Sequence, residues 1–463
     1  MNPKENFFSD IFMAAGDKMV EKRSDARLIP ALIVFVLTYV LMLALQAWRP
    51  WIALGAAGVF LLMGYLGLYP MNLASALGAV DYNVLLMIAA TMGLVSLFIE
   101  SRMPERLTEL LLQRVPNVMW AVTALALFAG VISAFVDNVA TVLMVAPVGL
   151  AIARKLEISP VPVLIAIAVS SNLQGAATMV GDTTSMLLGS FAGMNFMDFF
   201  CMEGRPGIFW GVELGALASL LVLLVLFRRE KAPVSCRVET AVEDRFPSLL
   251  MIATVLLLIG VSFLPQPENS ALLRLYELRS GLSCLLLCLV GLIRACVKAR
   301  GAAPLKRVLK ELDQETLLLL FGLFMVIEGI RAAGLIDAAA GIFYELAGHR
   351  PLLLYGLLVG VSVLLSAFID NIPYVATMLP VVQGIAGLMG EEPYVFYFGL
   401  LTGATLGGNL TPIGASANIT AIGILRKNGE TVTTRDFLRV GVPFTLAAVL
   451  VGAVYIWLVW GMG

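Results

Sequence analysis

Long apolar runs are the feature that leaves this chain the fewest folds. A helix needs about 20 residues to cross roughly 30 Å of hydrocarbon, and eight apolar runs of about that length lie at 28–48, 51–69, 83–99, 207–227, 247–265, 278–297, 315–331 and 439–461. Inside a bilayer, backbone N–H and C=O groups must be satisfied within the protein, which favours helices. The sequence therefore predicts an all-α polytopic membrane protein.

Composition supports this class and argues against others. The 463 residues are 60% hydrophobic and 14% charged, with a mean hydropathy of +0.92, whereas soluble domains carry about a quarter charged residues. The net charge is −1 and no basic stripe is present, so the lipid bilayer is the expected partner and nucleic acid is not. With one histidine, no P-loop and no nucleophile–base pair, we expect neither an enzyme, a cofactor nor a transition metal.

The start of the chain gives the expected location. Residues 1–27 mix acidic and basic side chains and lack the pattern of a cleavable signal peptide. We expect a polar or interfacial N-terminal segment, 1–27, in a multi-pass protein of the cell membrane, either an inner or a plasma membrane.

A hexapeptide occurs twice. SAFVDN occupies 133–138 and SAFIDN occupies 366–371, an offset of 366 − 133 = 233 residues. The same offset relates Thr178 to Thr411 and Gly181 to Gly414. This predicts two repeats, 28–227 and 247–461, joined by the segment 228–246.

Each repeat is predicted to contain three helices, a re-entrant helical hairpin, a broken helix and a final helix. The hairpins are expected at 117–154 and 352–389, and the broken helices at 160–194 and 393–426. Five crossings per repeat is an odd number, so the second repeat must be inverted relative to the first. The joining segment is placed in the cytoplasm by the positive-inside rule, because it carries Arg228, Arg229, Lys231, Arg237 and Arg245.

The duplicated motif brings carboxylates into apolar surroundings. An aspartate at the centre of a membrane helix costs about 2.5–3.5 kcal/mol on insertion scales, and ionisable residues kept there commonly serve ion pathways. Asp137 and Asp370 could bind Na⁺ or carry a proton, and Asn138 and Asn371 add amide oxygens. Ser133 and Ser366 open the two motifs. The alternative is that each polar pair only caps a helix at the hairpin turn.

A second pair of motifs predicts the helix breaks. SSNLQGAATMVGDTTS spans 170–185, and GATLGGNLTPIGASAN spans 403–418. Glycine and proline favour interruption of a helix, and polar side chains stand beside the glycines. The alternative is close helix packing through small residues. The candidate binding residues in these motifs are Asn172, Thr178, Gly181, Asp182, Asn409, Thr411, Gly414 and Asn418.

The two half-sites differ in charge. Asp182 aligns with Ala415, so one half carries an additional carboxylate if Asp182 faces the cavity. One half could then hold the coupling ion while the other contacts substrate. The alternative is that Asp182 only caps a helix away from the cavity.

The paired motifs resemble those of the ion transporter superfamily, which includes arsenite permeases, NhaD-type sodium–proton antiporters and P-protein-like permeases. SAFVDNVATVLMVAPV and SAFIDNIPYVATMLPVV are similar to the two hairpins of that group. The resemblance implies a scaffold domain, a moving transport domain with both hairpins and both broken helices, elevator-like alternating access, and a homodimer. The chain departs from the common Asn-Ile-Gly-Gly and Gly-Asp-Pro-Pro-Asn patterns, with Gln174 in the first and Thr183-Thr184-Ser185 in the second.

We therefore expect an ion-coupled secondary transporter for a small inorganic ion or small anion. Na⁺/H⁺ exchange is the leading chemistry, because ionised aspartates attract cations, and the coupling ion is H⁺ or Na⁺. Proton-driven efflux of arsenite or antimonite is the second reading, and carboxylate transport is the third. A passive ion channel on the same fold is the alternative from another class.

Overall fold

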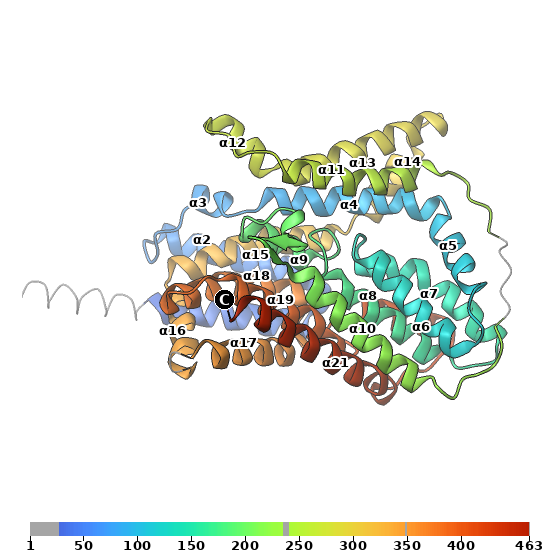
Figure 1. Ribbon diagram of the computed structural model, residues 1–463. Coiled ribbons are helices and arrows are strands. Elements are labelled where there is room, and N and C mark those ends of the chain that lie inside the picture. The colour runs from blue at the N-terminus through green and yellow to red at the C-terminus, as the bar shows by residue number, and fades with distance from the viewer. Residues whose placement is uncertain (1–26, 235–239, 348–349, 463) are drawn as a thin grey trace, which may run out of the picture.

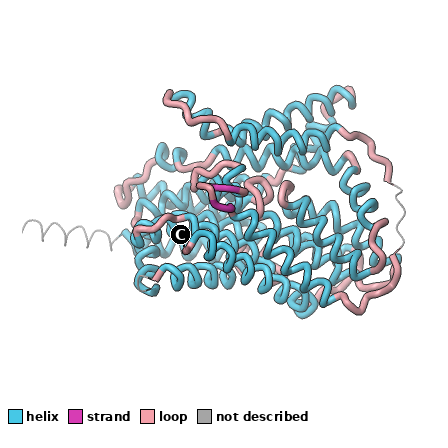
Figure 2. The backbone as a smooth tube through the Cα atoms, in the orientation of Figure 1, coloured by secondary structure: helices cyan, strands magenta, loops and turns pink. Residues whose placement is uncertain are grey.

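The protein is almost entirely helical (Figure 1). The computed structural model describes residues 27–234, 240–347 and 350–462. Within them the one sheet is a short antiparallel pair, β1 (Cys201–Met202) and β2 (Arg205–Pro206), which Figure 2 shows against the helices. The predicted all-α class is confirmed. The expected N-terminal segment lies outside the described residues apart from Arg27.

One group of helices packs in two sets and is called here the outer helices. Contacts pair α2 with α15 and α4 with α13, and α11 lies against α13 and α4. Short helices connect them. The group comprises the N-terminal helix Arg27–Ala44, η1 (Gln46–Trp48), α2 (Arg49–Tyr65), α3 (Leu73–Gly78), α4 (Tyr82–Glu100), α11 (Phe246–Ser262), α12 (Ser270–Glu277), α13 (Arg279–Lys298), α14 (Ala303–Glu311) and α15 (Gln314–Ala332).

The remaining helices form a second group, called here the core helices. Two linking helices, α5 (Met103–Leu112) and α16 (Leu335–Ala347), connect the groups. The core contains α6 (Val118–Ser133), α7 (Asn138–Lys155), α8 (Pro160–Gly175), α9 (Thr183–Phe191), η2 (Met197–Phe199), α10 (Ile208–Leu226), α17 (Pro351–Ser366), α18 (Asn371–Met389), α19 (Tyr394–Gly407), η3 (Gly408–Leu410), α20 (Ser416–Lys427) and α21 (Thr434–Trp460).

Eight helices in the described ranges are long and apolar enough to cross a membrane. Two predicted spans fall short of that test by themselves. The helix α11 has 17 residues, and α15 passes only together with α16, to which it is bent by 72°. The charges of Glu315, Glu328 and Arg331 explain the second case, because they lower the hydropathy of α15.

Helices in the two halves begin at matching positions. With the offset of 233 residues, Val118 of α6 corresponds to Pro351 of α17, and Asn138 of α7 corresponds to Asn371 of α18. Packing is also reciprocal: α7 contacts α20 while α18 contacts α9, and α4 contacts α13 while α15 contacts α2. A two-fold relation between the halves would give these pairings. Their inverted orientation in a membrane and the re-entrant character of the hairpins stay predictions.

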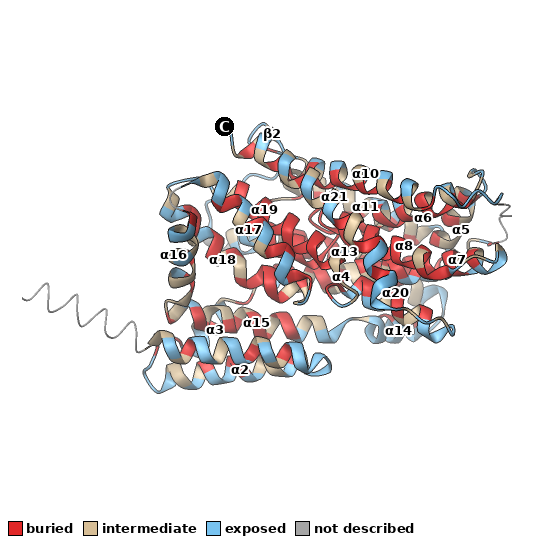
Figure 3. Ribbon diagram, turned by 90° about the horizontal axis from the view of Figure 1, so that it is seen from below, coloured by how far each residue is buried: buried red, intermediate tan, exposed pale blue. Residues whose placement is uncertain are grey.

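The interrupted helices occupy the interior. Apart from Pro162, every residue of α8 is buried, and so is Val395–Gly407 of α19. A helix that is apolar all round is stable only where neighbours cover every face, and Figure 3 shows this buried centre in red. The two helix breaks are therefore held inside the protein, where other side chains can satisfy their backbone groups.

Candidate functional site

The first hairpin turn is held together by its own polar residues. Asp137 is the N-cap of α7, and one of its oxygens, Oδ2, accepts from the backbone N–H groups of Val139 and Ala140 at 2.9 and 3.2 Å. Ser133 Oγ donates to Asn138 Oδ1 at 2.7 Å, which joins the two arms of the hairpin. The motif thus forms a closed turn with an acidic residue at a helix N-terminus, where negative charge is favourable.

The second hairpin turn has the same construction. Asp370 is the N-cap of α18, and its Oδ1 accepts from the Ile372 N–H at 3.2 Å. The Asn371 amide nitrogen donates to Ser366 Oγ and to the Gly414 carbonyl, because the opposite orientation would turn its oxygen toward acceptors only. The capping role considered for both polar pairs is therefore present, and it leaves carboxylate oxygens over for a ligand.

Each hairpin turn is fastened to the broken helix of its own half by equivalent hydrogen bonds. Thr178 donates to the Ala134 carbonyl, and Thr411 donates to the Ala367 carbonyl. Across the first break Ser185 donates to the Gly175 carbonyl at 3.3 Å. Across the second, Asn418 donates to the Gly408 carbonyl at 3.1 Å. The aligned residues therefore do the same structural work in both halves.

Two glycines allow the hairpin turns to approach the breaks. A Cβ atom on Gly181 would lie 2.6–2.8 Å from three backbone oxygens, those of Gly175, Ser133 and Ala134. The aligned Gly414 would meet the corresponding three oxygens at 2.6–2.9 Å. Real Cβ atoms essentially never come this close to backbone, so these positions need glycine for space.

Asparagines connect the two breaks to each other. Asn172 Nδ2 donates to the Thr405 carbonyl at 2.7 Å and to Asn409 Oδ1 at 3.1 Å. Asn409 Nδ2 donates in turn to the Val169 carbonyl at 2.9 Å. Asn138 Nδ2 also donates to Asn172 Oδ1 at 3.3 Å, which ties the first hairpin turn into this network. The hairpins and breaks of both halves form one buried polar unit.

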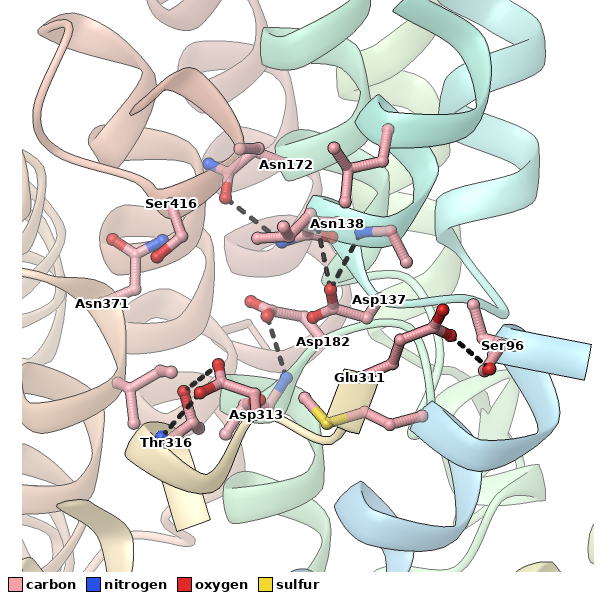
Figure 4. A pocket seen from close by; sticks show the side chains of 18 of the residues that line it. Ser96, Asp137, Asn138, Asn172, Asp182, Glu311, Asp313, Thr316, Asn371 and Ser416 are labelled. Carbon is pink, nitrogen blue, oxygen red and sulfur yellow. Dashed lines mark hydrogen bonds between the residues drawn. The ribbon is translucent and has the colours of Figure 1, made fainter. Parts of the chain in front are cut away.

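A cavity of about 390 Å³ opens beside this unit (Figure 4). Its wall carries five carboxylates, from Asp137, Asp182, Asp370, Glu311 and Asp313, and no basic side chain is among its described lining residues. In Figure 4 the Asp137 and Asp182 side chains lie next to each other. Such a wall attracts cations or protons, because like charges at short range raise the energy of the fully ionised state.

The carboxylates of the core differ in their partners. Asp182 caps α9, accepting from the Thr183 N–H at 2.8 Å and the Thr184 hydroxyl at 2.7 Å, so both readings of this residue apply. Asp370 Oδ2 lies 2.9 Å from Arg49 Nη1. Within the described ranges neither Asp137 nor Asp182 has an ion-pair partner. The predicted inequality of the half-sites thus has a second cause besides Asp182.

The fourteen predicted site residues divide into two sets. One set lines the cavity: Asp137, Asn138, Asn172, Asp182, Asp370 and Asn371. The other set lies behind it and holds the hairpin turns and breaks in place: Ser133, Thr178, Gly181, Ser366, Asn409, Thr411, Gly414 and Asn418. The structure brings both sets together, and their part in ion or substrate binding stays a prediction.

Comparison with known proteins decides the family. The family profile described as citrate transporter matches residues 32–398, and it matches again over 278–462. This chain belongs to the citrate transporter family. The predicted membership of the ion transporter superfamily is confirmed, and the protein is a multi-pass membrane transporter rather than an enzyme.

Other relatives agree with this family. An uncharacterised transporter of Mycobacterium tuberculosis is 31% identical over 435 residues, which cover 92% of this chain and 98% of that protein. The P protein of Mus musculus is 26% identical over 477 residues, covering 87% of this chain and 56% of the P protein. The second match supports the resemblance to P-protein-like permeases.

Solved transporter structures share the fold. The YdaH transporter of Alcanivorax borkumensis aligns with a TM-score of 0.57 at 15% identity, over 91% of this chain and 98% of that one. The MtrF protein of Neisseria gonorrhoeae, described as one of a class of antimetabolite efflux pumps, gives 0.58 at 14% identity, over 87% and 85%. At these identities the likeness concerns the fold alone.

Within this member of the family, the departures from the superfamily motifs have identifiable contacts. Gln174 donates from Nε2 to Glu213 Oε2 of α10 at 3.1 Å. Thr184, in place of a proline, bonds Asp182 and lies 3.0 Å from the Thr405 hydroxyl of the other half. Polar contacts therefore stabilise the first break where the superfamily pattern has glycine and prolines.

Four cavity residues escaped prediction, and all belong to outer helices. Glu311 accepts from the Ser96 hydroxyl, while Asp313 caps α15 and bonds Thr316. The pattern Asp-x-x-Thr before an apolar run could have indicated the cap. Nothing in the local sequence places these residues opposite Asp137, because their segments meet only in the folded protein.

Proposed function

We propose that this transporter is a secondary active carrier in which H⁺ or Na⁺ binds at the cavity formed by Asp137, Asp182 and Asp370. The observation that carries the proposal is the uneven charge of the cavity wall: five carboxylates line it, and Arg49 pairs with only one of them. Carboxylates shielded from water are stable when a proton or a bound cation neutralises them. Na⁺/H⁺ exchange is the leading chemistry, since one site that binds either ion alternately suffices.

The geometry also supports a defined cation site. Asp137 uses only Oδ2 for helix capping, so within the described residues Oδ1 accepts no hydrogen bond. The Asn138 side chain lies beside it on the same wall of the cavity. Hard cations such as Na⁺ prefer carboxylate and amide oxygens, which these residues provide.

Citrate or another carboxylate is the second candidate, favoured by the family match. The wall repels a free carboxylate anion, and no described basic side chain lines it. Carboxylate transport on this site therefore requires that protons or cations enter with the anion. The homodimer and elevator-like movement implied by the resemblance belong to the proposal for either substrate.

The first test uses purified protein in liposomes that contain a pH dye and carry a proton gradient. We expect added Na⁺ or Li⁺ to change the internal pH. D137N and D370N should each abolish the change, because asparagine retains the N-cap but cannot carry the charge. D81N is the matched control, since Asp81 caps α4 outside this cavity in the same way, and it should exchange at the wild-type rate.

The possible results separate the candidates. A wild-type protein that responds to neither cation contradicts Na⁺/H⁺ exchange. Accumulation of labelled citrate driven by the same proton gradient would then support the carboxylate candidate, and arsenite movement would support the efflux reading. Rapid electrogenic flux without accumulation of any solute would indicate a channel.

A further inference from the structure

The two hairpin aspartates differ at the oxygen that does not face a helix N–H group. At Asp137 this oxygen is Oδ1, which accepts no hydrogen bond from any described residue. At Asp370 it is Oδ2, which accepts from Arg49 Nη1 at 2.9 Å. Both side chains of this ion pair are largely buried, with exposures of 15% for Arg49 and 13% for Asp370. One of two equivalent positions thus holds a protein cation.

Arg49 is fixed to the outer helices. It is the first residue of α2, and its Nε donates to the Met42 carbonyl of the preceding helix at 3.3 Å. The helix α2 packs tightly on α15: a Cβ added to Gly322 would lie 2.8 Å from the Leu54 nitrogen, with backbone atoms of Ala53 nearby. The guanidinium is therefore presented by a rigid pair of outer helices.

Asp370 belongs to the core helices, so the ion pair crosses from one group to the other. A second contact crosses beside it, where the Tyr39 hydroxyl of the N-terminal helix donates to the Pro373 carbonyl of α18 at 2.7 Å. The cavity lies near Ile99, at the end of α4, and Asp313, at the start of α15. The adjoining loops, 101–116 and 298–310, are those predicted to face the cytoplasm, which places the ion pair near the cytoplasmic end.

We propose that Arg49 is a built-in counter-ion that replaces the coupling cation at Asp370 when the site faces the cytoplasm. The inference rests on the proposed function of the cavity. Formation of the ion pair removes the charge that would hold a cation at Asp370 and so favours its release. Movement of the core relative to α2 separates the pair, and Asp370 is then free to bind a cation again.

Arginine suits this role because of its chemistry. Its guanidinium remains protonated at any physiological pH, so its competition with a cation does not depend on its own titration. Its planar group also donates in two directions, here toward Asp370 and Met42. A lysine would supply a similar charge from a single flexible atom and would hold the position less firmly.

The direct test measures binding of ²²Na⁺ to the purified protein in detergent at fixed pH. R49Q should bind Na⁺ about tenfold more tightly than the wild type, a change that corresponds to about 1.4 kcal/mol. R49K keeps the charge and should stay within about threefold of the wild type. R307Q is the matched control, because Arg307 forms an exposed ion pair with Glu100 elsewhere on the outer helices, and it should leave the affinity unchanged.

A transport measurement separates counter-ion exchange from a merely structural role. In liposomes with the cation on the cytoplasmic side, R49Q should lower both KM and kcat, because tighter binding is accompanied by slower release. A structural defect would lower kcat without lowering KM. R49K should restore values near those of the wild type.

Each remaining result decides the inference. Equal Na⁺ affinities of R49Q and the wild type overturn it, as does the absence of Na⁺ binding in both. If R49Q does not fold, R49K is compared alone, and a rise in affinity of about threefold supports the inference while no rise overturns it. Failure of the proposed function is distinguishable, because that failure shows as absent cation-coupled pH change in wild-type liposomes.

Discussion

At the scale of single residues, Gly181 and Gly414 should be sensitive to the addition of one methyl group. Alanine at either position must displace three backbone oxygens, and such overpacking typically costs about 1–3 kcal/mol of unfolding free energy. We expect G181A and G414A to lower the thermal unfolding midpoint in detergent and to slow transport.

The control for this prediction is G58A. Gly58 is exposed within α2 and no atom lies within 4 Å of its added Cβ, so alanine should stabilise this helix by up to about 1 kcal/mol. A midpoint for G181A equal to that of the wild type would show that the first hairpin turn can move away from the break without loss.

The sequence predicted the residues of the core site better than their partners. The duplicated motifs identified Asp137 and Asp370, since repetition at one offset is visible without a structure. Arg49 was read only as a cytoplasmic loop charge, although it pairs with Asp370 across 321 residues of sequence. Contacts between distant segments depend on how the outer helices pack, and local patterns carry no information about that.

At the scale of elements, the joining segment is fastened to the outer helices just before α11. Asp244 forms two hydrogen bonds with Arg294 of α13, at 2.7 and 3.2 Å, and one with Lys298 at 3.0 Å. The hydrogen bonds from Arg294 hold the pKa of Asp244 well below its usual range. Nearby, Arg106 of α5 donates to the Thr240 carbonyl at 2.9 Å, so the segment also contacts the linking helix.

This attachment gives a pH-dependent prediction. A carboxylate whose pKa is lowered by folding stabilises the protein above its unfolded pKa of about 3.9, and the contribution is lost as the pH falls through the folded value. D244N should therefore reduce the unfolding free energy by at most about 1 kcal/mol at pH 7, because Arg294 and Lys298 are substantially exposed.

The measurement compares thermal unfolding of D244N and the wild type between pH 8 and pH 3. The difference should be constant down to about pH 5 and should shrink only below about pH 4. A difference that disappeared near pH 6 would mean that another group, and not Asp244, controls this attachment.

At the scale of the whole molecule, the helix positions follow from sequence while their arrangement does not. Apolar length and glycine-rich breaks located the helices closely, since these are local properties of a membrane chain. The helix α11 is shorter than expected because it ends at Ser262, before the apolar residues Phe263 and Leu264. The cavity required the outer helices to be placed against the core, which depends on interlocking side chains rather than on hydropathy.

Inversion of the two repeats is the whole-molecule prediction, and it assigns sides to matched loops. Residues 69–82 follow α2 in the first half, and residues 298–310 follow α13 in the second. If the halves are inverted, these loops lie on opposite sides of the membrane. A74C and K306C, each exposed and each introduced into a chain without other cysteines, should react with a membrane-impermeant thiol reagent from opposite sides of oriented vesicles. Labelling of both from one side would require parallel repeats, and the cavity would then have no symmetric outward-facing counterpart.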